Sequence, residues 1–176
     1  MILWVNGAYG AGKTSVCRAL QAKLHRSHLF DPEEVGDVIR RILPVELWKD
    51  NFQDYPLWRS TTAALLQAAA AAYCGVILVP MTVVRGDYQR ELLDPLRRAG
   101  ISVCPVTLLA SRETVLARLL GRGEQPDAWC IKQIDQCVER LSSEIEGYPI
   151  DTEGKRLSEV AEEIWKRFLS TEEKHV

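Results

Sequence analysis

A phosphate-binding motif near the N-terminus is the feature that most constrains this sequence. Residues 7–14 read Gly-Ala-Tyr-Gly-Ala-Gly-Lys-Thr and match G-x-x-x-x-G-K-[ST] at every fixed position. An apolar run rich in strand formers, residues 2–5, precedes the motif, and apolar residues at helical spacing follow it. The sequence therefore predicts a buried strand, a glycine-rich turn and a helix, which is the context in which this motif binds nucleotides.

The residue types of this motif suit a triphosphate tail. Backbone N–H groups of the loop provide many donors at close range, and its glycines let the main chain approach the anion. The N-terminus of the following helix adds its dipole. Lys13 is expected to reach the β- and γ-phosphates, and the Thr14 hydroxyl is expected to bind Mg²⁺. The predicted cofactors are thus ATP and Mg²⁺, and the predicted nucleotide-binding residues are Gly7, Ala8, Tyr9, Gly10, Ala11, Gly12, Lys13, Thr14 and Ser15.

Length, charge and cysteine content narrow the class of protein. The chain has 176 residues, which predicts a single domain over residues 1–176 with a full hydrophobic core. Its net charge of -2 gives no electrostatic basis for nucleic acid as a partner. No apolar stretch is long enough to span a bilayer, and the 5 cysteines without a C-x-x-C pair favour a reducing, cytoplasmic compartment.

Strand-like and helical segments alternate along the chain. Five segments have the length and composition of strands, with helical segments between them: residues 2–5, 29–30, 76–79, 101–109 and 148–152. After a phosphate-binding loop, this alternation predicts an α/β fold of the P-loop nucleoside triphosphate hydrolase type, with a five-stranded parallel sheet flanked by helices. The chain resembles the small P-loop kinases of the nucleoside and shikimate type. One long helix is expected over residues 128–145.

A last helix is expected over residues 157–169, because apolar residues recur there on one face. Its polar face carries Glu159, Glu162 and Glu163, which suits an anionic lipid surface poorly. We therefore expect the apolar face to dock on the sheet, and the tail after Thr171 to fray.

Asp31 is the carboxylate that the sequence places best for chemistry. It follows the second predicted strand, and ligands of open parallel sheets lie beyond the carboxyl ends of the strands. Asp31 is therefore expected to bind Mg²⁺ or to orient and deprotonate an acceptor hydroxyl. The alternative is that Asp31 caps a helix that begins at Pro32. No acidic residue follows the strand at 76–79, which weakens the case for a motor or switch ATPase.

Aromatic residues are concentrated between residues 48 and 58, interleaved with polar ones. A flat apolar wall with polar groups between suits a planar or sugar-like ligand, so this segment is expected to face the acceptor. The alternative, equally weighted, is that the aromatic residues anchor an irregular connection to the core. The predicted substrate residues are Phe52, Tyr55, Trp58 and Arg59.

A basic, glycine-flanked segment over about residues 112–128 is interpreted as a lid. Arg118 and Arg122 lie in it, with Gly121 and Gly123 beside them. A basic side chain on a mobile segment can neutralise charge as the γ-phosphate is transferred, so both arginines are catalytic candidates together with Lys13 and Asp31. The alternative is an ordinary solvated helix.

Several segments together resemble the tunicamycin resistance protein (TmrB-like) family. They are residues 4–14, 30–36, 52–59, 77–82, 107–111 and 132–138. The resemblance covers most of the chain. It implies an ATP-binding protein that protects a bacterium from tunicamycin, a uridine-containing nucleoside antibiotic. It also implies a cytoplasmic location with peripheral membrane contact through the C-terminal helix.

The function expected from motif and resemblance together is transfer of the ATP γ-phosphate to a hydroxyl of tunicamycin or a related nucleoside or sugar. Two alternatives stay open at this point. One is an ATP-dependent protein that sequesters the drug without chemistry, and the other is a housekeeping nucleoside or sugar kinase. The sequence leaves both a monomer and a homodimer open.

Overall fold

A parallel sheet of five strands forms the centre of the molecule. The computed structural model describes residues 1–170, so the fraying expected after Thr171 lies outside the described residues. The strands are β1 (Ile2–Gly7), β2 (Ser27–Leu29), β3 (Val76–Pro80), β4 (Val103–Leu109) and β5 (Tyr148–Asp151). Their order in the sheet is β2-β3-β1-β4-β5, and all four pairings are parallel. The predicted fold class is confirmed.

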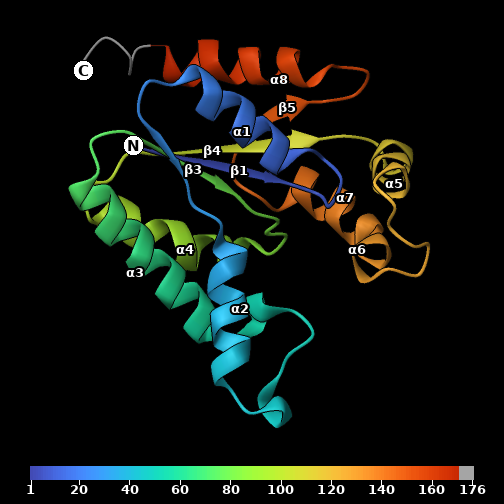
Figure 1. Ribbon diagram of the computed structural model, residues 1–176, viewed down its shortest axis with the longest axis horizontal. Helices are drawn as coiled ribbons and strands as arrows, with labels where there is room; N and C mark the ends of the chain where they lie inside the picture. The colour runs from blue at the N-terminus through green and yellow to red at the C-terminus, as the bar shows by residue number, and fades with distance from the viewer. Residues whose placement is uncertain (171–176) are drawn as a thin grey trace.

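Helices cover both faces of this sheet (Figure 1). On one face α1 (Lys13–Lys23) packs against α8 (Leu157–Ile164), which continues as a π-helical turn over Trp165–Leu169. On the other face α3 (Pro56–Ala72) packs against α4 (Gly86–Arg98). The other helices are α2 (Pro32–Ile42), α5 (Arg112–Gly121), α6 (Trp129–Lys132) and α7 (Ile134–Ser143).

The central strand β1 shows why two cores form. Successive side chains of a strand point to opposite faces of the sheet. Leu3 and Val5 accordingly lie in the core with α1 and α8, whereas Ile2 and Trp4 lie in the core with α3 and α4. Because both faces are covered, every residue of β1 is buried, which is typical of a parallel sheet.

Two sequence expectations about helices have clear outcomes. The helix expected over residues 128–145 is wrong as one element: α6 and α7 are separate, because the N–H of Gln133 bonds to the carbonyl of Cys130 and tightens the turn. The apolar face of the last helix docks on the sheet as expected, with Val160 and Ile164 buried in the core.

Within residues 1–170, no helix has the length and apolarity needed to cross a bilayer.

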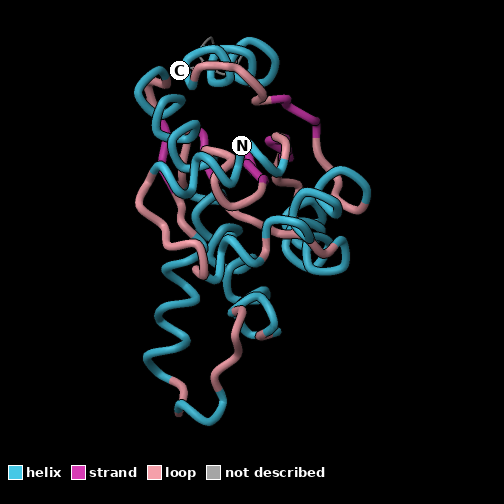
Figure 2. Tube along the Cα trace, turned by 90° about the vertical axis from the view of Figure 1, so that its right-hand side faces the viewer, coloured by secondary structure: helices cyan, strands magenta, loops and turns pink. Residues whose placement is uncertain are grey.

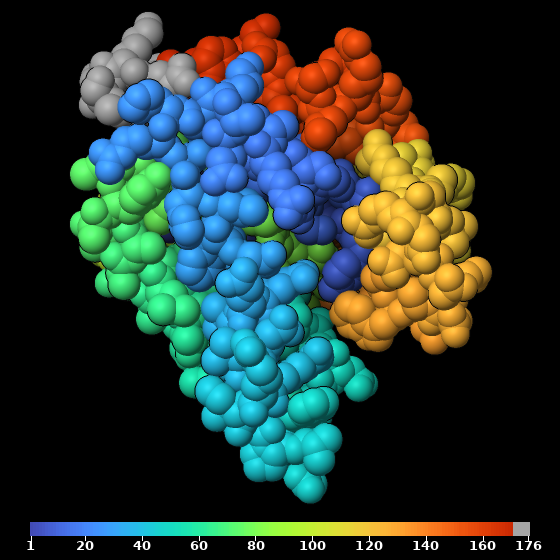
Figure 3. Space-filling view, viewed as in Figure 1, coloured from blue at the N-terminus to red at the C-terminus, as the bar shows by residue number. Residues whose placement is uncertain are grey.

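An arm projects away from the sheet on the side that α3 and α4 cover (Figure 1 and Figure 2). It consists of α2, the connection through the short turn Val45–Leu47, and the turn Phe52–Asp54 that leads into α3. The space-filling view shows a hollow between the blue N-terminal segment, the cyan arm and the orange region of α6 and α7 (Figure 3). The side chains that line this hollow form the candidate site.

Candidate functional site

The loop between β1 and α1 has the conformation that its glycines permit. Gly10 and Gly12 have positive φ angles of 84° and 92°, in the region that residues with a Cβ rarely occupy. A Cβ at Gly10 would also lie 2.7 Å from the carbonyl oxygen of Val115 on α5. The α1 helix begins directly after Gly12, so its first N–H groups face the loop.

Lys13 is held at the centre of this loop. Its Nζ donates a hydrogen bond of 2.9 Å to the carbonyl of Ala8. Burial lowers the pKa of Lys13 to about 8, although the negative charge of Glu33 opposes this effect; the positive charge of Arg122 adds to it. The depressed pKa means that the surroundings of Lys13 do not fully offset the positive charge of its ammonium group. A bound polyanion would stabilise this charged form.

A second set of buried polar residues fixes where the loop begins. The Asn6 carboxamide accepts from the N–H groups of Gly7 (2.8 Å) and Val83 (2.9 Å), and donates to the carbonyl of Val83 (2.8 Å). The Thr82 hydroxyl donates to the carbonyl of Gly7 (2.9 Å). These bonds tie the phosphate loop to the end of β3. No local sequence pattern pointed to Asn6.

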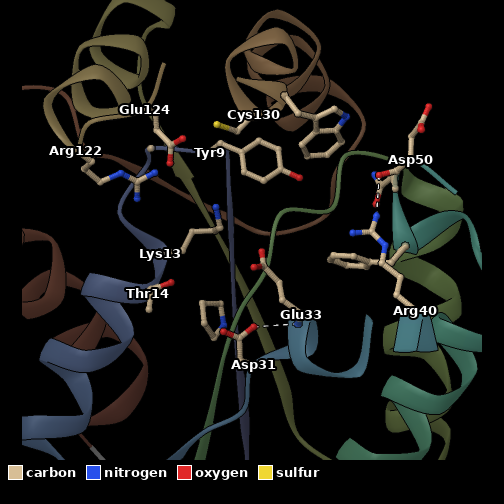
Figure 4. Close-up of a pocket in the computed structure, with 15 residues that line it drawn as sticks. Tyr9, Lys13, Thr14, Asp31, Glu33, Arg40, Asp50, Arg122, Glu124 and Cys130 are labelled. Atoms are coloured by element: carbon tan, nitrogen blue, oxygen red, sulfur yellow. Dashed lines mark hydrogen bonds between the residues drawn. The ribbon is translucent and has the colours of Figure 1, made fainter. Parts of the chain in front are cut away.

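Two carboxylates stand opposite Lys13 on the first turn of α2 (Figure 4). Asp31 caps this helix, and its side chain accepts from the N–H of Glu33 at 3.0 Å. Glu33 reaches into the cavity, and no donor within residues 1–170 hydrogen bonds to its carboxylate. Partial burial and the charge of Asp31 raise the pKa of Glu33, while Lys13 acts in the opposite direction. Glu33 is not among the site residues predicted from the sequence, but it has the properties of a base.

One cavity of about 520 Å³ joins these groups. The phosphate loop, the start of α2, the arm and the segment from Arg122 to α6 surround it (Figure 4). Its lining residues are Tyr9, Gly10, Lys13, Thr14, Asp31, Glu33, Arg40, Asp50, Asn51, Phe52, Pro80, Arg122, Glu124, Trp129 and Cys130. The cavity thus brings together the predicted residues Lys13, Thr14, Asp31 and Arg122.

The two candidate arginines of the lid segment separate in space. Arg122 lines the main cavity next to Glu124. Arg118 points to the other side of the phosphate loop, where its guanidinium donates to the hydroxyl (3.0 Å) and carbonyl (2.9 Å) of Thr152. There it lines a second cavity of about 230 Å³, together with Ala11, Gly12, Ser15, Val16, Thr152, Lys155, Leu157 and Val160.

Of the four predicted substrate residues, the structure brings only Phe52 to the cavity. Trp58 is 0% exposed, and its indole N–H donates to the carbonyl of Pro32 at 2.9 Å. Tyr55 is buried and bonds to the main chain of residues 47 and 49. Arg59 pairs with Glu91 at 2.6 Å and also binds the carbonyl of Gln53. These three residues match the alternative interpretation, in which the segment is anchored to the core.

Gly36 is what allows Phe52 to lie against α2. A Cβ on Gly36 would lie 2.7 Å from Cγ of the Phe52 ring, so Gly36→Ala must displace the ring. We expect Gly36→Ala to lower the free energy of unfolding by about 1–3 kcal/mol, as overpacking does, although alanine is the better helix former. Urea denaturation measures this change. Gly121→Ala is the matched control, since a Cβ there meets no atom within 4 Å; equal stability of both variants would contradict the prediction.

The donor set beside the phosphate loop suits Mg²⁺. The Thr14 hydroxyl and the carboxylates of Asp31 and Glu33 line the same cavity and are all hard oxygen ligands. Within residues 1–170 there is no group of three or more His, Cys, Asp or Glu side chains that would form a closed metal cage. Mg²⁺ at nucleotide sites is commonly held by only one or two protein ligands, with phosphates and water completing the shell.

Comparison with known proteins gives consistent matches. The family model for the AAA domain matches residues 2–142. The structure of the tunicamycin resistance protein of Deinococcus radiodurans is 29% identical with a TM-score of 0.78, and the match covers 94% of this chain and 93% of that chain. No curated protein sequence matches the chain. The similarity to tunicamycin resistance proteins inferred from the sequence is confirmed.

Two further solved structures share the fold at lower identity. A sugar kinase from Janibacter sp. is 16% identical with a TM-score of 0.66, covering 94% of this chain and 92% of that chain. The shikimate kinase of Acinetobacter baumannii is 19% identical with a TM-score of 0.62, covering 97% and 93%. At these identities the similarity establishes the fold alone.

Proposed function

We propose that this chain, which belongs to the AAA-domain family whose model spans residues 2–142, transfers the γ-phosphate of ATP to a hydroxyl of tunicamycin or a related small molecule. One observation carries the proposal. A single cavity contains the phosphate-binding Lys13 and Thr14 on one side, two carboxylates on α2 beside them, and room for a second ligand toward the arm. Phosphoryl transfer needs these three parts in one place.

The nucleotide would occupy both cavities. The loop N–H groups and Lys13 hold the β- and γ-phosphates in the main cavity. The second cavity lies on the far side of the same loop, is lined by Ser15 and by the apolar Val16 and Val160, and has room for a base. Arg118 forms one wall of this second cavity. This assigns Arg118 to the base and ribose end and Arg122 to the transferred phosphate.

The protein groups around the acceptor supply a base and a positive charge. As the acceptor oxygen forms its bond to the γ-phosphorus, the bond to the β–γ bridging oxygen breaks, and ADP leaves. Glu33 takes the proton of the acceptor hydroxyl, while Asp31 keeps its place as the cap of α2. Thr14 and Asp31 would hold Mg²⁺, which offsets phosphate charge when bound. Arg122 neutralises charge on the transferred group.

Nucleotide binding should be accompanied by proton uptake at alkaline pH. The free protein has a Lys13 pKa of about 8, so the side chain is largely neutral at pH 9. Bound phosphates favour the ammonium form and raise this pKa, so Lys13 takes up a proton on binding. Calorimetry of ATP binding at pH 9, in buffers of different ionisation enthalpy, is expected to show uptake approaching one proton. At pH 6.5 Lys13 is protonated before and after binding, and its contribution vanishes; equal uptake at both pH values would contradict the assignment.

The release of ADP tests the proposed reaction. Purified protein with MgATP is followed by a coupled ADP assay, with and without tunicamycin. The expected result is ADP formation that depends on the drug and saturates with its concentration. Tight, ATP-dependent binding of the drug without ADP formation would favour sequestration over transfer. ADP formation with uridine or a simple sugar but not with the drug would favour a housekeeping kinase.

A further inference from the structure

The turn Phe52–Asp54 presents one side chain to the main cavity and buries the next. Phe52 lines the cavity, whereas Gln53 lines neither cavity and is 3% exposed. Burial of a glutamine amide is costly unless the amide is hydrogen bonded. We infer that Gln53 is a positioning residue, which holds the acceptor side of the cavity, at Phe52, in place relative to the phosphate loop. The inference rests on the proposed function for the ligands that the cavity binds.

Two hydrogen bonds connect Gln53 to the start of the phosphate loop. Gln53 Nε2 donates to the main-chain carbonyl of Thr82, which follows β3. The Thr82 hydroxyl donates in turn to the carbonyl of Gly7, at 2.9 Å. Among residues 1–170, Gln53 is the only hydrogen-bond donor to the Thr82 carbonyl. All three residues are buried, so these bonds are shielded from competition by water.

The main chain of Gln53 is fixed independently of its side chain. Its N–H donates to Asn51 Oδ1 at 3.0 Å, and its carbonyl accepts from Arg59 Nη1. Arg59 is itself held by Glu91 of α4, whose carboxylate lies 2.6 Å from the Arg59 Nε. The turn is thus attached to α3 and α4 through its main chain, and to the phosphate loop through the Gln53 amide. Removal of the amide breaks the second attachment and leaves the first intact.

Loss of this attachment should affect the acceptor more than the nucleotide. Without the Gln53 amide, the Thr82 carbonyl is a buried acceptor with no donor, and the turn is free to move away from the strand end. Phe52 moves with the turn, and a displacement of about 1 Å in a substrate site can lower a rate about 100-fold. The phosphate loop keeps a bond of its own, because Asn6 still accepts from the N–H of Gly7 at 2.8 Å. The nucleotide side of the cavity therefore stays ordered.

Steady-state kinetics of Gln53→Leu with MgATP and tunicamycin test the inference. The expected result is a kcat/KM for tunicamycin that is lowered about tenfold or more, with ATP affinity within about twofold of the wild-type value. Gln89→Leu is the matched control, because Gln89 is also buried, donates to a main-chain carbonyl (that of Glu146, at 2.6 Å) and lines neither cavity. This control should melt at a lower temperature but keep the wild-type kcat/KM. Equal kcat/KM values in the two variants, or equal losses for ATP and tunicamycin in Gln53→Leu, would overturn the inference.

A double-mutant cycle shows whether Gln53 acts through the wall of the cavity. Because Gln53 acts by placing Phe52, Gln53→Leu should change kcat/KM less than about twofold in the Phe52→Ala background. A full tenfold loss in that background would contradict the positioning role. Gln53→Glu keeps the shape of the side chain without its amide donor, and it repeats the comparison should the leucine variant not fold.

The same variants separate this inference from the proposed transfer. Wild-type protein that binds tunicamycin without releasing ADP would refute the transfer alone. The dissociation constant of tunicamycin then replaces kcat/KM in the comparison, and Gln53→Leu is expected to raise it about tenfold while Gln89→Leu leaves it unchanged. Full transfer activity in Gln53→Leu would refute the positioning role alone.

Discussion

Lys13→Met is expected to abolish ATP binding while the fold stays intact. The ammonium group is the one protein cation inside the loop, and its loss should lower kcat/KM for ATP by at least about 100-fold, as removal of a phosphate-stabilising group does. The depressed pKa of Lys13, about 8, shows that the charge is costly where it lies. Methionine has a side chain of similar length to lysine but no charge. The Lys13→Met variant should therefore melt at the same temperature as the wild-type protein or at a higher one. Calorimetry with ATP and thermal melting measure the two effects separately.

The control for Lys13→Met is Lys166→Met. Lys166 is exposed on the π-helical turn that follows α8, and its Nζ lies 3.5 Å from the carboxylate of Glu162. An ion pair of this kind contributes little to stability, and this one is remote from both cavities. ATP binding should be unchanged in this variant. Wild-type ATP affinity in Lys13→Met would contradict the assignment of the loop.

Glu33→Gln is expected to lower kcat by about 100- to 10,000-fold and to leave ATP affinity unchanged, which is the loss typical of a removed general base. The raised pKa of Glu33 adds a second signature. A base must be deprotonated to act, so activity should fall as pH falls through this pKa, above the range of an ordinary carboxyl group. This acid limb should disappear from the residual activity of Glu33→Gln. Steady-state kinetics between pH 4 and 8 measure both effects.

Two neighbouring substitutions separate the roles of the carboxylates on α2. Glu34→Gln is the matched control, since Glu34 lies on the same helical turn and does not line the main cavity. Asp31→Asn should mainly weaken the dependence on Mg²⁺, and it should cost less than about 0.5 kcal/mol of stability at the helix cap, because asparagine caps helices about as well as aspartate does. If instead Asp31→Asn abolished turnover and Glu33→Gln kept it, Asp31 would be the base, as the sequence first indicated.

The parts of the fold that local patterns determine were predictable from the sequence. The phosphate loop follows from its fixed residues and their strand–helix context, and both strand and helix form as expected. The final helix packs against the sheet with the apolar face that its sequence periodicity predicts. Strand alternation with helices predicted the parallel sheet, because parallel strands need crossover connections.

The other features of the site depend on contacts that local sequence patterns do not predict. The sequence placed Tyr55, Trp58 and Arg59 near the acceptor because they are aromatic or basic. Their burial depends on distant partners, such as Pro32 for Trp58 and Glu91 for Arg59. Asp31 and Glu33 are two residues apart and line the same cavity, and only the direction of the capped turn decides which of the two carboxylates accepts the capping hydrogen bond. The contacts of Arg40 with the main chain of residues 49 and 50 carry no local signal.

The mass of tunicamycin after incubation with the protein and MgATP tests the central claim most directly. Our account predicts a drug species heavier by one phosphoryl group, in an amount equal to the ADP released, and fragmentation would locate the hydroxyl. The same species should be absent with Lys13→Met and reduced at least about 100-fold with Glu33→Gln. Unchanged drug after complete incubation, with the wild-type protein shown to bind both ATP and tunicamycin, would contradict phosphoryl transfer.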